Sequence, residues 1–406
     1  MISEPTEAYV WVWLPGCAEP VVAGLLEANG PIAEFTYGTS YRARPDAISL
    51  WPDELPLESG RQRPPRGMHV AGVIADAGPD AWAKRVIEAR RPSGAGTNLG
   101  LLTYLLESGT DRIGALDFQT DAGSYQPRWN QAALDDMVSA VERLDAGEPL
   151  PAELNEALLH GSSIGGARPK VLLNDGDRKL IAKMSSSTDT YPMVKAEAIA
   201  MELARRAGLN VAPVEVTTSM GHDILVVERF DRGPGGDRRL MLSANTILGV
   251  DRVGASVGSY YALADVIRAR FTDATETLRE LFGRIVFNIC VSNTDDHAHN
   301  HAAFWDGQML TLTPAYDICP QRRPNGPTNQ ALEIAKNGYR TARLAGCIDA
   351  AGDYLLERHD ASDIVGHQVQ IIRDEWDAAA DVCQLSQGER NLLRGFVLNP
   401  DIFEPA

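Results

Sequence analysis

The sequence predicts an α+β protein made of two lobes with an added N-terminal β-rich subdomain. Residues 8–14, Ala-Tyr-Val-Trp-Val-Trp-Leu, form an alternating run that is typical of a strand. Residues 171–173 and 180–184 flank an Asn-Asp-Gly-Asp turn, which is a strong β-hairpin pattern. From residue 260 onward, apolar side chains recur mainly at helical spacing, so the C-terminal lobe should be mostly helical.

Residues 1–150 are predicted to form the N-terminal subdomain. A Pro-Gly turn ends the first strand, and further short strands are expected at Ile32–Tyr37, Ala47–Leu50 and Gly114–Phe118. Amphipathic helices are expected at Ala81–Arg90, Leu99–Glu107 and Asn130–Leu144.

Residues 151–234 are predicted to form a small lobe around the β-hairpin. A helix is expected at Pro151–Leu158, and Gly165 and Gly166 follow in the loop that leads to the hairpin, where glycine lets the backbone approach a ligand. The remaining elements of this lobe are expected to be the helix Met193–Ala207 and the strands Val211–Thr217 and Asp223–Val227.

A lysine at the end of such a hairpin is how a kinase holds the phosphates of ATP, and Lys183 has that position. Such a lysine needs a nearby carboxylate, and Glu197 on the next helix is the best-placed candidate. The segment Glu228–Arg232, followed by glycine-rich residues 233–236, is where a hinge between two lobes would lie.

Residues 235–406 are predicted to form the helical lobe. Its helices are expected at Tyr260–Arg270, Ala274–Cys290, Ile348–Leu356, Ala361–Ala379 and Gln387–Val397.

One stretch of the helical lobe carries residues that indicate a reaction. Asp295 and Asn300 are five positions apart, the interval between the base Asp and the metal-binding Asn of a kinase catalytic loop, and Asp317 follows after a short apolar hairpin. A kinase needs a carboxylate near the substrate hydroxyl and oxygen ligands for Mg²⁺. We therefore expect a protein-kinase-like fold, with Asp295 as base and Asn300 and Asp317 as metal ligands.

The same stretch permits a second chemistry. His297, His299 and His301 alternate, and on a strand this spacing would place three imidazoles on one face, where they could bind Zn²⁺ for hydrolysis. Against this, the Asp pair and the Asn occupy a loop between an apolar helix and a strand. A zinc-dependent hydrolase is therefore the alternative hypothesis.

Composition limits the class of partner. The chain has 406 residues and a formal net charge of −17, which disfavours broad binding to nucleic acid or anionic membrane. We expect a cytoplasmic protein, because the sequence has neither a signal-peptide pattern nor an apolar run of about 18 residues. Its five cysteines are scattered without a C-x-x-C pair, which fits reduced thiols.

An ordered set of motifs runs through the chain: Ser162-Ser-Ile-Gly-Gly-Ala-Arg-Pro-Lys170, Lys183, Glu197, Glu228-Arg-Phe-Asp-Arg232, Asn293-Thr-Asp-Asp-His-Ala-His-Asn300 and Tyr316-Asp317. This set resembles the HipA-type serine/threonine kinase toxins of bacterial toxin–antitoxin modules. Residues 41–50 and 111–118 also resemble the N-terminal subdomain of that family.

The resemblance implies roles for individual residues. Asp295 would be the base, Asn300 and Asp317 would bind Mg²⁺, and ATP would contact Gly165, Gly166, Ala167, Lys170, Lys183, the main chain of Glu228, Arg229 and Phe230, His297 and Tyr316. The family carries an autophosphorylated serine before its glycine loop, and Ser163 matches it, with Ser162 adjacent. The loop ends Arg168-Pro169-Lys170 where some members have Gln-Glu-Lys, so those side-chain contacts are not carried over.

The resemblance also implies partners. Family members phosphorylate aminoacyl-tRNA synthetases or translation factors, and a small helix-turn-helix antitoxin neutralises them, so that contact with DNA would be indirect. A third hypothesis is a non-catalytic partner in a transcriptional repressor complex. It predicts that the change Asp295→Asn leaves the biological effect intact.

Overall fold

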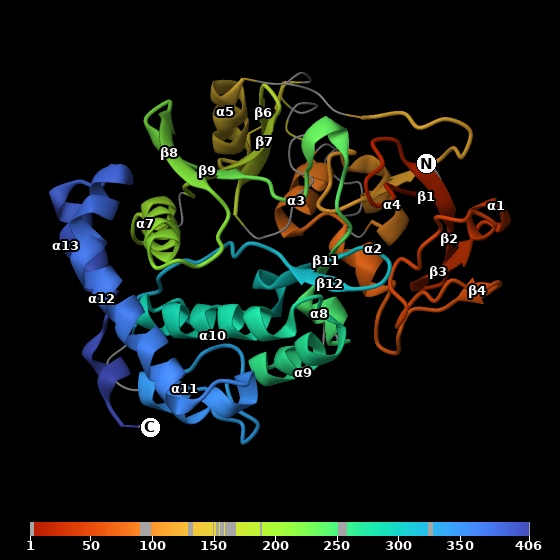
Figure 1. The fold of residues 1–406 in the computed structure, drawn as a ribbon. Helices are drawn as coiled ribbons and strands as arrows, with labels where there is room; N and C mark the ends of the chain where they lie inside the picture. The colour runs from red at the N-terminus through yellow and green to blue at the C-terminus, as the bar shows by residue number, and fades with distance from the viewer. Residues whose placement is uncertain are drawn as a thin grey trace.

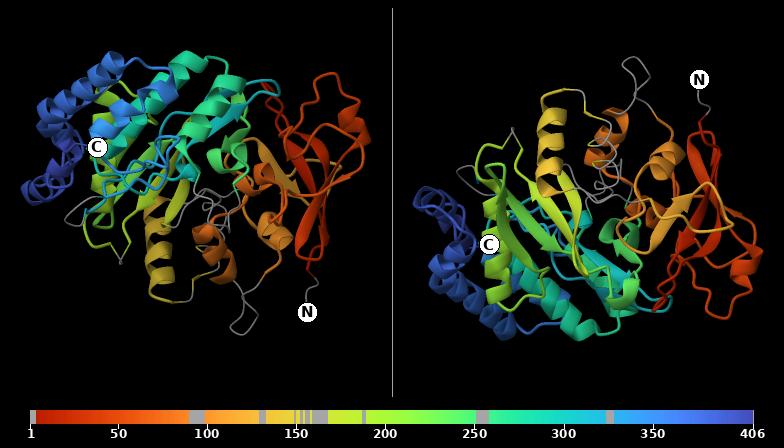
Figure 2. Two further views of the ribbon diagram at one scale, coloured as in Figure 1. Left: turned by 90° about the horizontal axis from the view of Figure 1, so that it is seen from below. Right: turned by 90° about the horizontal axis from the view of Figure 1, so that it is seen from above.

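The computed structural model describes residues 4–89, 99–128, 133–148, 150–151, 154, 158, 168–186, 189–250, 258–323 and 328–405. This part of the chain contains three sheets, with the N-terminal sheet on one side of the molecule and the C-terminal helices on the other (Figures 1 and 2). Most of the helix expected at 151–158 lies outside the described residues. So do the glycine-loop positions Ser162, Ser163, Gly165, Gly166 and Ala167.

The N-terminal unit is built on a five-stranded antiparallel sheet of order β4-β3-β2-β1-β5. Its strands are β1 (Glu7–Val12), β2 (Val21–Asn29), β3 (Ile32–Tyr37), β4 (Arg61–Gln62) and β5 (Leu116–Gln119). The sequence did not predict β2, which contains Gly24. A Cβ atom at Gly24 would lie 2.2 Å from the Thr36 carbonyl oxygen, so the neighbouring strand β3 packs closely only against glycine.

The strand predicted at Ala47–Leu50 is wrong, because this segment is a loop. Two tyrosine hydroxyls bond its backbone in place of a neighbouring strand. The Leu50 N–H donates to Tyr37 Oη at 2.8 Å, and Tyr41 Oη donates to the Ile48 carbonyl at 2.9 Å. Hydrogen bonds to the two tyrosines thus satisfy backbone groups of this segment, although no neighbouring strand pairs with it.

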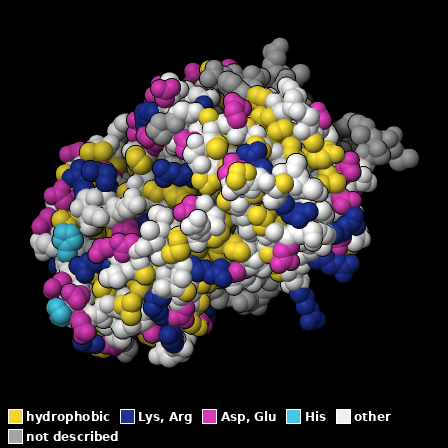
Figure 3. All heavy atoms as spheres, turned by 45° about the vertical axis from the view of Figure 1, so that its right-hand side comes forward, with side chains coloured by type: hydrophobic (Ala, Val, Ile, Leu, Met, Phe, Trp, Pro, Cys, Tyr) yellow, Lys and Arg dark blue, Asp and Glu magenta, His cyan; other side chains and the backbone are white. Residues whose placement is uncertain are grey.

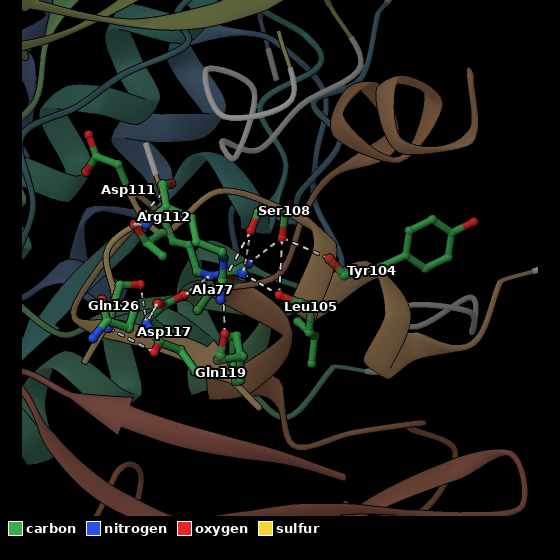
Figure 4. A network of polar contacts seen from close by, with 12 residues as sticks. Ala77, Tyr104, Leu105, Ser108, Asp111, Arg112, Asp117, Gln119 and Gln126 are labelled. Carbon is green, nitrogen blue, oxygen red and sulfur yellow. Dashed lines mark hydrogen bonds and ion pairs between the residues drawn. The ribbon is translucent and has the colours of Figure 1, made fainter. Parts of the chain in front are cut away.

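Four short helices complete the N-terminal unit: α1 (Thr39–Arg42), α2 (Gly72–Asp76), α3 (Ala81–Ala89) and α4 (Leu101–Glu107). The buried Arg112 guanidinium holds the end of α4 against the sheet (Figure 4). It donates to Asp117 at 2.8 Å on β5 and to Ser108 Oγ at 2.7 Å just after α4. Because a buried guanidinium is stable only when paired, these contacts fix the position of α4 on β5.

The small lobe is a four-stranded antiparallel sheet of order β6-β7-β9-β8 covered by helices on both faces. Its elements are α5 (Leu134–Asp145), β6 (Lys170–Asp175), β7 (Arg178–Met184), α7 (Met193–Arg206), β8 (Val214–Ser219) and β9 (His222–Glu228). Along β9, Ile224 and Val226 pack with α3 and α5 in one core, and Leu225 and Val227 pack with α7 in the main core. Helices α3 and α5 therefore share a core with this sheet.

The helical lobe surrounds α10 (Ala274–Cys290), which is buried on most of its surface. The other elements are η1 (Pro234–Gly236), β10 (Met241–Ser243), α8 (Ala244–Ile247), α9 (Tyr260–Arg270), η2 (Ala298–Asn300), β11 (Ala302–Trp305), β12 (Leu310–Leu312), α11 (Leu344–Asp349), η3 (Ala351–Tyr354), α12 (Arg358–Val382), α13 (Gln387–Arg394) and η4 (Pro400–Phe403). Helices α9 and α10 have their predicted bounds. A turn of 3₁₀-helix, η3, occupies much of the range where the sequence predicted one helix at Ile348–Leu356.

The surface combines charges of both signs. On the face shown in Figure 3, acidic and basic side chains are interspersed, with hydrophobic side chains visible between them. None of the described helices combines the length and the apolar character needed to cross a membrane.

Candidate active site

Lys183 lies at the centre of a compact charged cluster. It projects from the end of β7, and its Nζ atom is 2.5 Å from Glu197 Oε1 on α7 and 2.6 Å from Asp317 Oδ1. The three residues come from three separate segments, so this cluster joins the small lobe to the helical lobe. The predicted Lys183–Glu197 pair is present, and the structure adds Asp317 to it.

The cluster differs in exposure from one end to the other. The Glu197 side chain is 5% exposed, whereas that of Asp317 is 45% exposed. The attraction of Lys183 lowers the pKa of Asp317 to about 2, against the opposing effect of burial. Burial lowers the pKa of Lys183, but the two carboxylates outweigh it and hold that pKa above its ordinary value. Asp317 is therefore ionised and accessible to a ligand.

The segment before Asp317 fixes its position. Ala315 exchanges backbone hydrogen bonds with the chain after α7, accepting from the Ala212 N–H at 2.9 Å and donating to the Asn210 carbonyl at 2.8 Å. Tyr316 Oη donates to the His299 carbonyl at 2.7 Å. Asp317 itself has φ of 60°, in the left-handed region that a residue with a side chain seldom occupies. Such backbone strain concentrates at functional sites.

Aromatic rings line the predicted hinge. The ring of Phe230, just after β9, lies 5.7 Å from that of Tyr316 and 6.0 Å from that of Phe304 on β11. The backbone N–H groups of Glu228 and Arg229 donate to the Pro213 and Lys179 carbonyls. Within the described residues the Phe230 N–H has no acceptor, so this group is one hinge donor that remains for a ligand.

The side chains of the hinge residues Glu228 and Arg229 have structural contacts. Arg229 is buried and donates to Asp231 Oδ2 at 2.8 Å and to Asp111 Oδ1 at 3.0 Å. Glu228 forms an exposed ion pair with Arg178. The Arg229 side chain is thus committed to the fold, and the main-chain nucleotide contacts that the resemblance implies for Glu228 and Arg229 stay a prediction.

Lys170 is cross-strand neighbour to Lys183, so both side chains leave the same face of the sheet. Its Nζ atom forms an ion pair at 3.2 Å with Asp80, which also accepts a hydrogen bond from the Ala83 N–H at the start of α3. Burial lowers the pKa of Lys170 despite that pairing. A nucleotide phosphate would therefore have to compete with Asp80 for this ammonium.

The predicted catalytic loop follows α10. Asp295 is exposed, and the Asn300 side chain is buried at the end of η2, where the Asn300 N–H donates to the His297 carbonyl at 2.8 Å. The loop meets the Lys183 cluster through the Tyr316 hydrogen bond to His299. Asp295, Asn300 and Asp317 thus lie on two segments that contact each other directly.

The three histidines do not form the zinc site of the alternative hypothesis. His297 to His301 span the 3₁₀-helix η2 and its two caps, so they are not on a strand with one shared face. His299 hydrogen bonds to Asn245, and His301 Nε2 lies 2.8 Å from the buried Asp296 carboxylate. His297 contributes to lowering the pKa of Asp317. Among described residues, no three His, Cys, Asp or Glu side chains are placed to hold a metal ion.

Sequence reasoning missed the partners of the site residues. Asp80, Asp111 and Asp296 were not singled out, although each pairs with a residue of a quoted motif. Asp296 is adjacent to Asp295, but adjacency alone could not show which of the two is buried. Asp80 and Asp111 lie far from their partners in sequence, and no local pattern links them.

Comparison with known proteins places these observations in a family. The model of the HipA-like C-terminal domain matches residues 162–376. The chain is 31% identical over 196 residues to the protein named "Putative kinase Y4mE" of Sinorhizobium fredii strain NGR234, over 43% of this chain and 46% of that protein. It is 25% identical over 187 residues to the serine/threonine-protein kinase toxin HipA of Shewanella oneidensis, over 38% of this chain and 42% of that protein. The chain thus spans a little under half the length of these relatives.

The fold has a solved counterpart. A chain of the Shewanella oneidensis MR-1 complex of HipA, HipB and operator DNA superposes with a TM-score of 0.68 at 20% identity, covering 95% of this chain and 94% of that chain. This likeness confirms the predicted α+β, two-lobed fold with its N-terminal β-rich part.

Proposed function

Because this chain belongs to the HipA-like C-terminal domain family, we propose that it is an ATP- and Mg²⁺-dependent serine/threonine protein kinase. The observation that carries the proposal is the Lys183–Glu197–Asp317 cluster beside the loop of Asp295 and Asn300. A paired lysine, an accessible carboxylate, an amide and a separate carboxylate base are the groups that phosphoryl transfer requires.

The residues present fit the nucleotide and metal that such a reaction uses. The Asn300 amide and the Asp317 carboxylate offer the hard oxygen donors that Mg²⁺ prefers, and Mg²⁺ when bound would neutralise charge on the β- and γ-phosphates. Lys183 would hold phosphate oxygens. The Phe230 N–H would donate to adenine, with the Phe230 and Tyr316 rings beside it.

Other side chains of this protein would have the remaining roles in the reaction. Asp295 would accept the proton of the substrate hydroxyl, since its exposed carboxylate can reach an incoming side chain. Glu197 holds Lys183 in place, and the strong Lys183 charge keeps Asp317 ionised. Lys170 would contribute to phosphate binding where the nucleotide displaces Asp80, and Ser163 would be the position of autophosphorylation.

The biological role that we propose is that of the toxin in a toxin–antitoxin module. The family and the toxin HipA among its relatives support this proposal. A small helix-turn-helix protein like the HipB of the matched complex would be the antitoxin, and contact with DNA would pass through it. The substrate would be a protein, with an aminoacyl-tRNA synthetase as the first candidate and inhibition of translation as the consequence.

Calorimetric titration with ATP tests the nucleotide site. The parent chain should bind ATP more tightly with Mg²⁺ than without it, and Lys183→Met should weaken binding by about tenfold or more, as expected for loss of one charge-assisted contact. Lys179→Met, on the same strand but bonded to Asn174, is the matched control and should bind like the parent. Absence of ATP binding by the parent would contradict the proposed nucleotide site.

A further inference from the structure

Three hydrogen bonds converge on one oxygen of Asp296. Asp296 Oδ2 accepts from Tyr260 Oη at 2.5 Å, from Asn288 Nδ2 at 2.7 Å and from His301 Nε2 at 2.8 Å. Tyr260 is the first residue of α9, Asn288 lies in the last turns of α10, and His301 directly follows Asn300. The carboxylate therefore ties the loop to two helices and to its own far end.

The burial of this network distinguishes Asp296 from its neighbour. Asp296 and His301 are each 3% exposed, whereas Asp295 is exposed. A buried carboxylate is costly unless donors surround it, and here the donors include a buried hydroxyl, an amide and an imidazole. Burial and the nearby Asp296 raise the pKa of Tyr260 well above its ordinary value, so its hydroxyl remains a donor. Asp296 is thus placed to fix the conformation of the loop, and its buried carboxylate has no access to a substrate.

The network encloses the two predicted functional residues of the loop. Asp295 precedes Asp296, and Asn300 precedes His301, so the Asp296–His301 bond closes the loop just behind both. The entry to the loop is also held, because Asn293 Nδ2 donates to Asn288 Oδ1 at 3.0 Å. At its exit, the His301 carbonyl accepts from the Ala244 N–H at 2.7 Å. Little freedom remains in the separation of Asp295 from Asn300.

We infer that Asp296, with His301 and Tyr260, is the positioning group that sets the spacing between the base Asp295 and the metal-binding Asn300. The third histidine of the alternating motif thereby acts on catalysis through hydrogen bonding and not through a metal. This inference rests on the proposed kinase function. It assigns Asp296 and His301 roles behind the reacting groups, where a shift of about 1 Å costs on the order of a hundredfold in rate.

Deletion of one hydroxyl provides a mild test with a matched control. Tyr260→Phe removes one donor from Asp296. Tyr354→Phe removes an equally buried hydroxyl that donates to the Ile334 carbonyl and not to Asp296. Transfer of label from γ-labelled ATP to protein with Mg²⁺ and the affinity for ATP are measured for both variants. We expect Tyr260→Phe to lower the rate about tenfold or more with ATP affinity unchanged, and Tyr354→Phe to keep the parent rate.

A pair of changes at His301 separates positioning from general stability. His301→Gln keeps an N–H donor near the position of Nε2, and His301→Ala removes it. The Gln variant should recover most of the rate that the Ala variant loses, at matched melting temperature. Equal losses in His301→Gln and His301→Ala, or equal rates in Tyr260→Phe and the parent, would overturn the inference while the kinase function stands. If the parent transfers no label from γ-labelled ATP to protein, the proposed function fails and takes this inference with it.

Discussion

Asp317 combines a close ion pair with an exposed side chain and a left-handed backbone. Its carboxylate forms a close ion pair with Lys183, yet 45% of the side chain is exposed. Its backbone has φ of 60°, and its carboxylate reaches Lys183 at the end of β7. The sequence predicted Lys183 and Glu197 as a pair, and Asp317 separately as a metal ligand. It could not show that all three form one cluster, because a sequence motif carries no information about the contact between lobes.

Removal of the Asp317 carboxylate should abolish phosphoryl transfer and leave the fold intact. Asp317→Ala deletes the ionised metal ligand, and loss of one such preorganised charge costs about 10²–10³-fold in rate. Transfer from γ-labelled ATP is compared with that of Asp177→Ala, a change in the exposed turn between β6 and β7. Unchanged transfer by Asp317→Ala at saturating Mg²⁺ would remove the metal assignment.

A fall in pH should reveal how much the Lys183–Asp317 ion pair contributes to the free energy of unfolding. The pKa of Asp317 in the folded chain is about 2, below its ordinary value of 3.8, so the pair stabilises the fold above about pH 4 and loses that contribution as the pH falls toward 2. Unfolding free energies are measured for the parent and Asp317→Asn. The parent should lose stability relative to the variant between about pH 4 and pH 2. Parallel curves over this range would contradict the pairing.

At the scale of elements, the hinge is joined to the N-terminal unit by a buried cluster of charges. Asp231 pairs with Arg229 and Arg232 and accepts from the Gly114 N–H at 2.8 Å, while Asp111 pairs with both arginines. The hinge and its partners in the N-terminal unit are more than 100 residues apart in the chain. Arg229 and Asp111, for example, are separated by 118 positions. The sequence indicated a hinge here but not its attachment, since local periodicity cannot reveal such distant pairs.

Neutralising Asp231 should destabilise the fold strongly. Asp231→Asn leaves two buried guanidiniums with one fewer carboxylate, and breaking a buried ion pair costs about 3–5 kcal/mol. Urea unfolding is compared with that of Asp46→Asn, which breaks the exposed Arg44–Asp46 pair and should leave stability nearly unchanged. Similar midpoints for both variants would show that the hinge cluster contributes no more than a surface pair.

At the scale of the whole molecule, the order of the lobes was predictable and their packing was not. Helices α9 and α10 matched their predicted bounds because apolar side chains recur at helical spacing over both ranges, and in the structure Ser259 and Asp273 cap their first turns. The strand β2 and the helix α2 were missed. The sharing of one core between α3, α5 and the small-lobe sheet could not be foreseen, because it depends on strand order.

Expression of the chain in a bacterial host should arrest growth if it is a kinase toxin. Asp295→Asn should relieve the arrest, because the exposed carboxylate would no longer accept the substrate proton. Colony counts after induction are compared at equal protein level. If the Asn variant arrests growth as strongly as the parent, the effect comes from binding, and the non-catalytic partner hypothesis gains.

The most direct test of the account is the transfer of label from γ-labelled ATP to protein in the presence of Mg²⁺, with the labelled residue identified by mass spectrometry. We predict that the parent chain incorporates phosphate on a serine or threonine, with Ser163 as the first candidate. Chelation of the metal, Asp295→Asn and Asp317→Ala should each abolish incorporation. Absence of label in the parent, or equal labelling in all three cases, would contradict a phosphoryl-transfer site at Lys183, Asp295, Asn300 and Asp317.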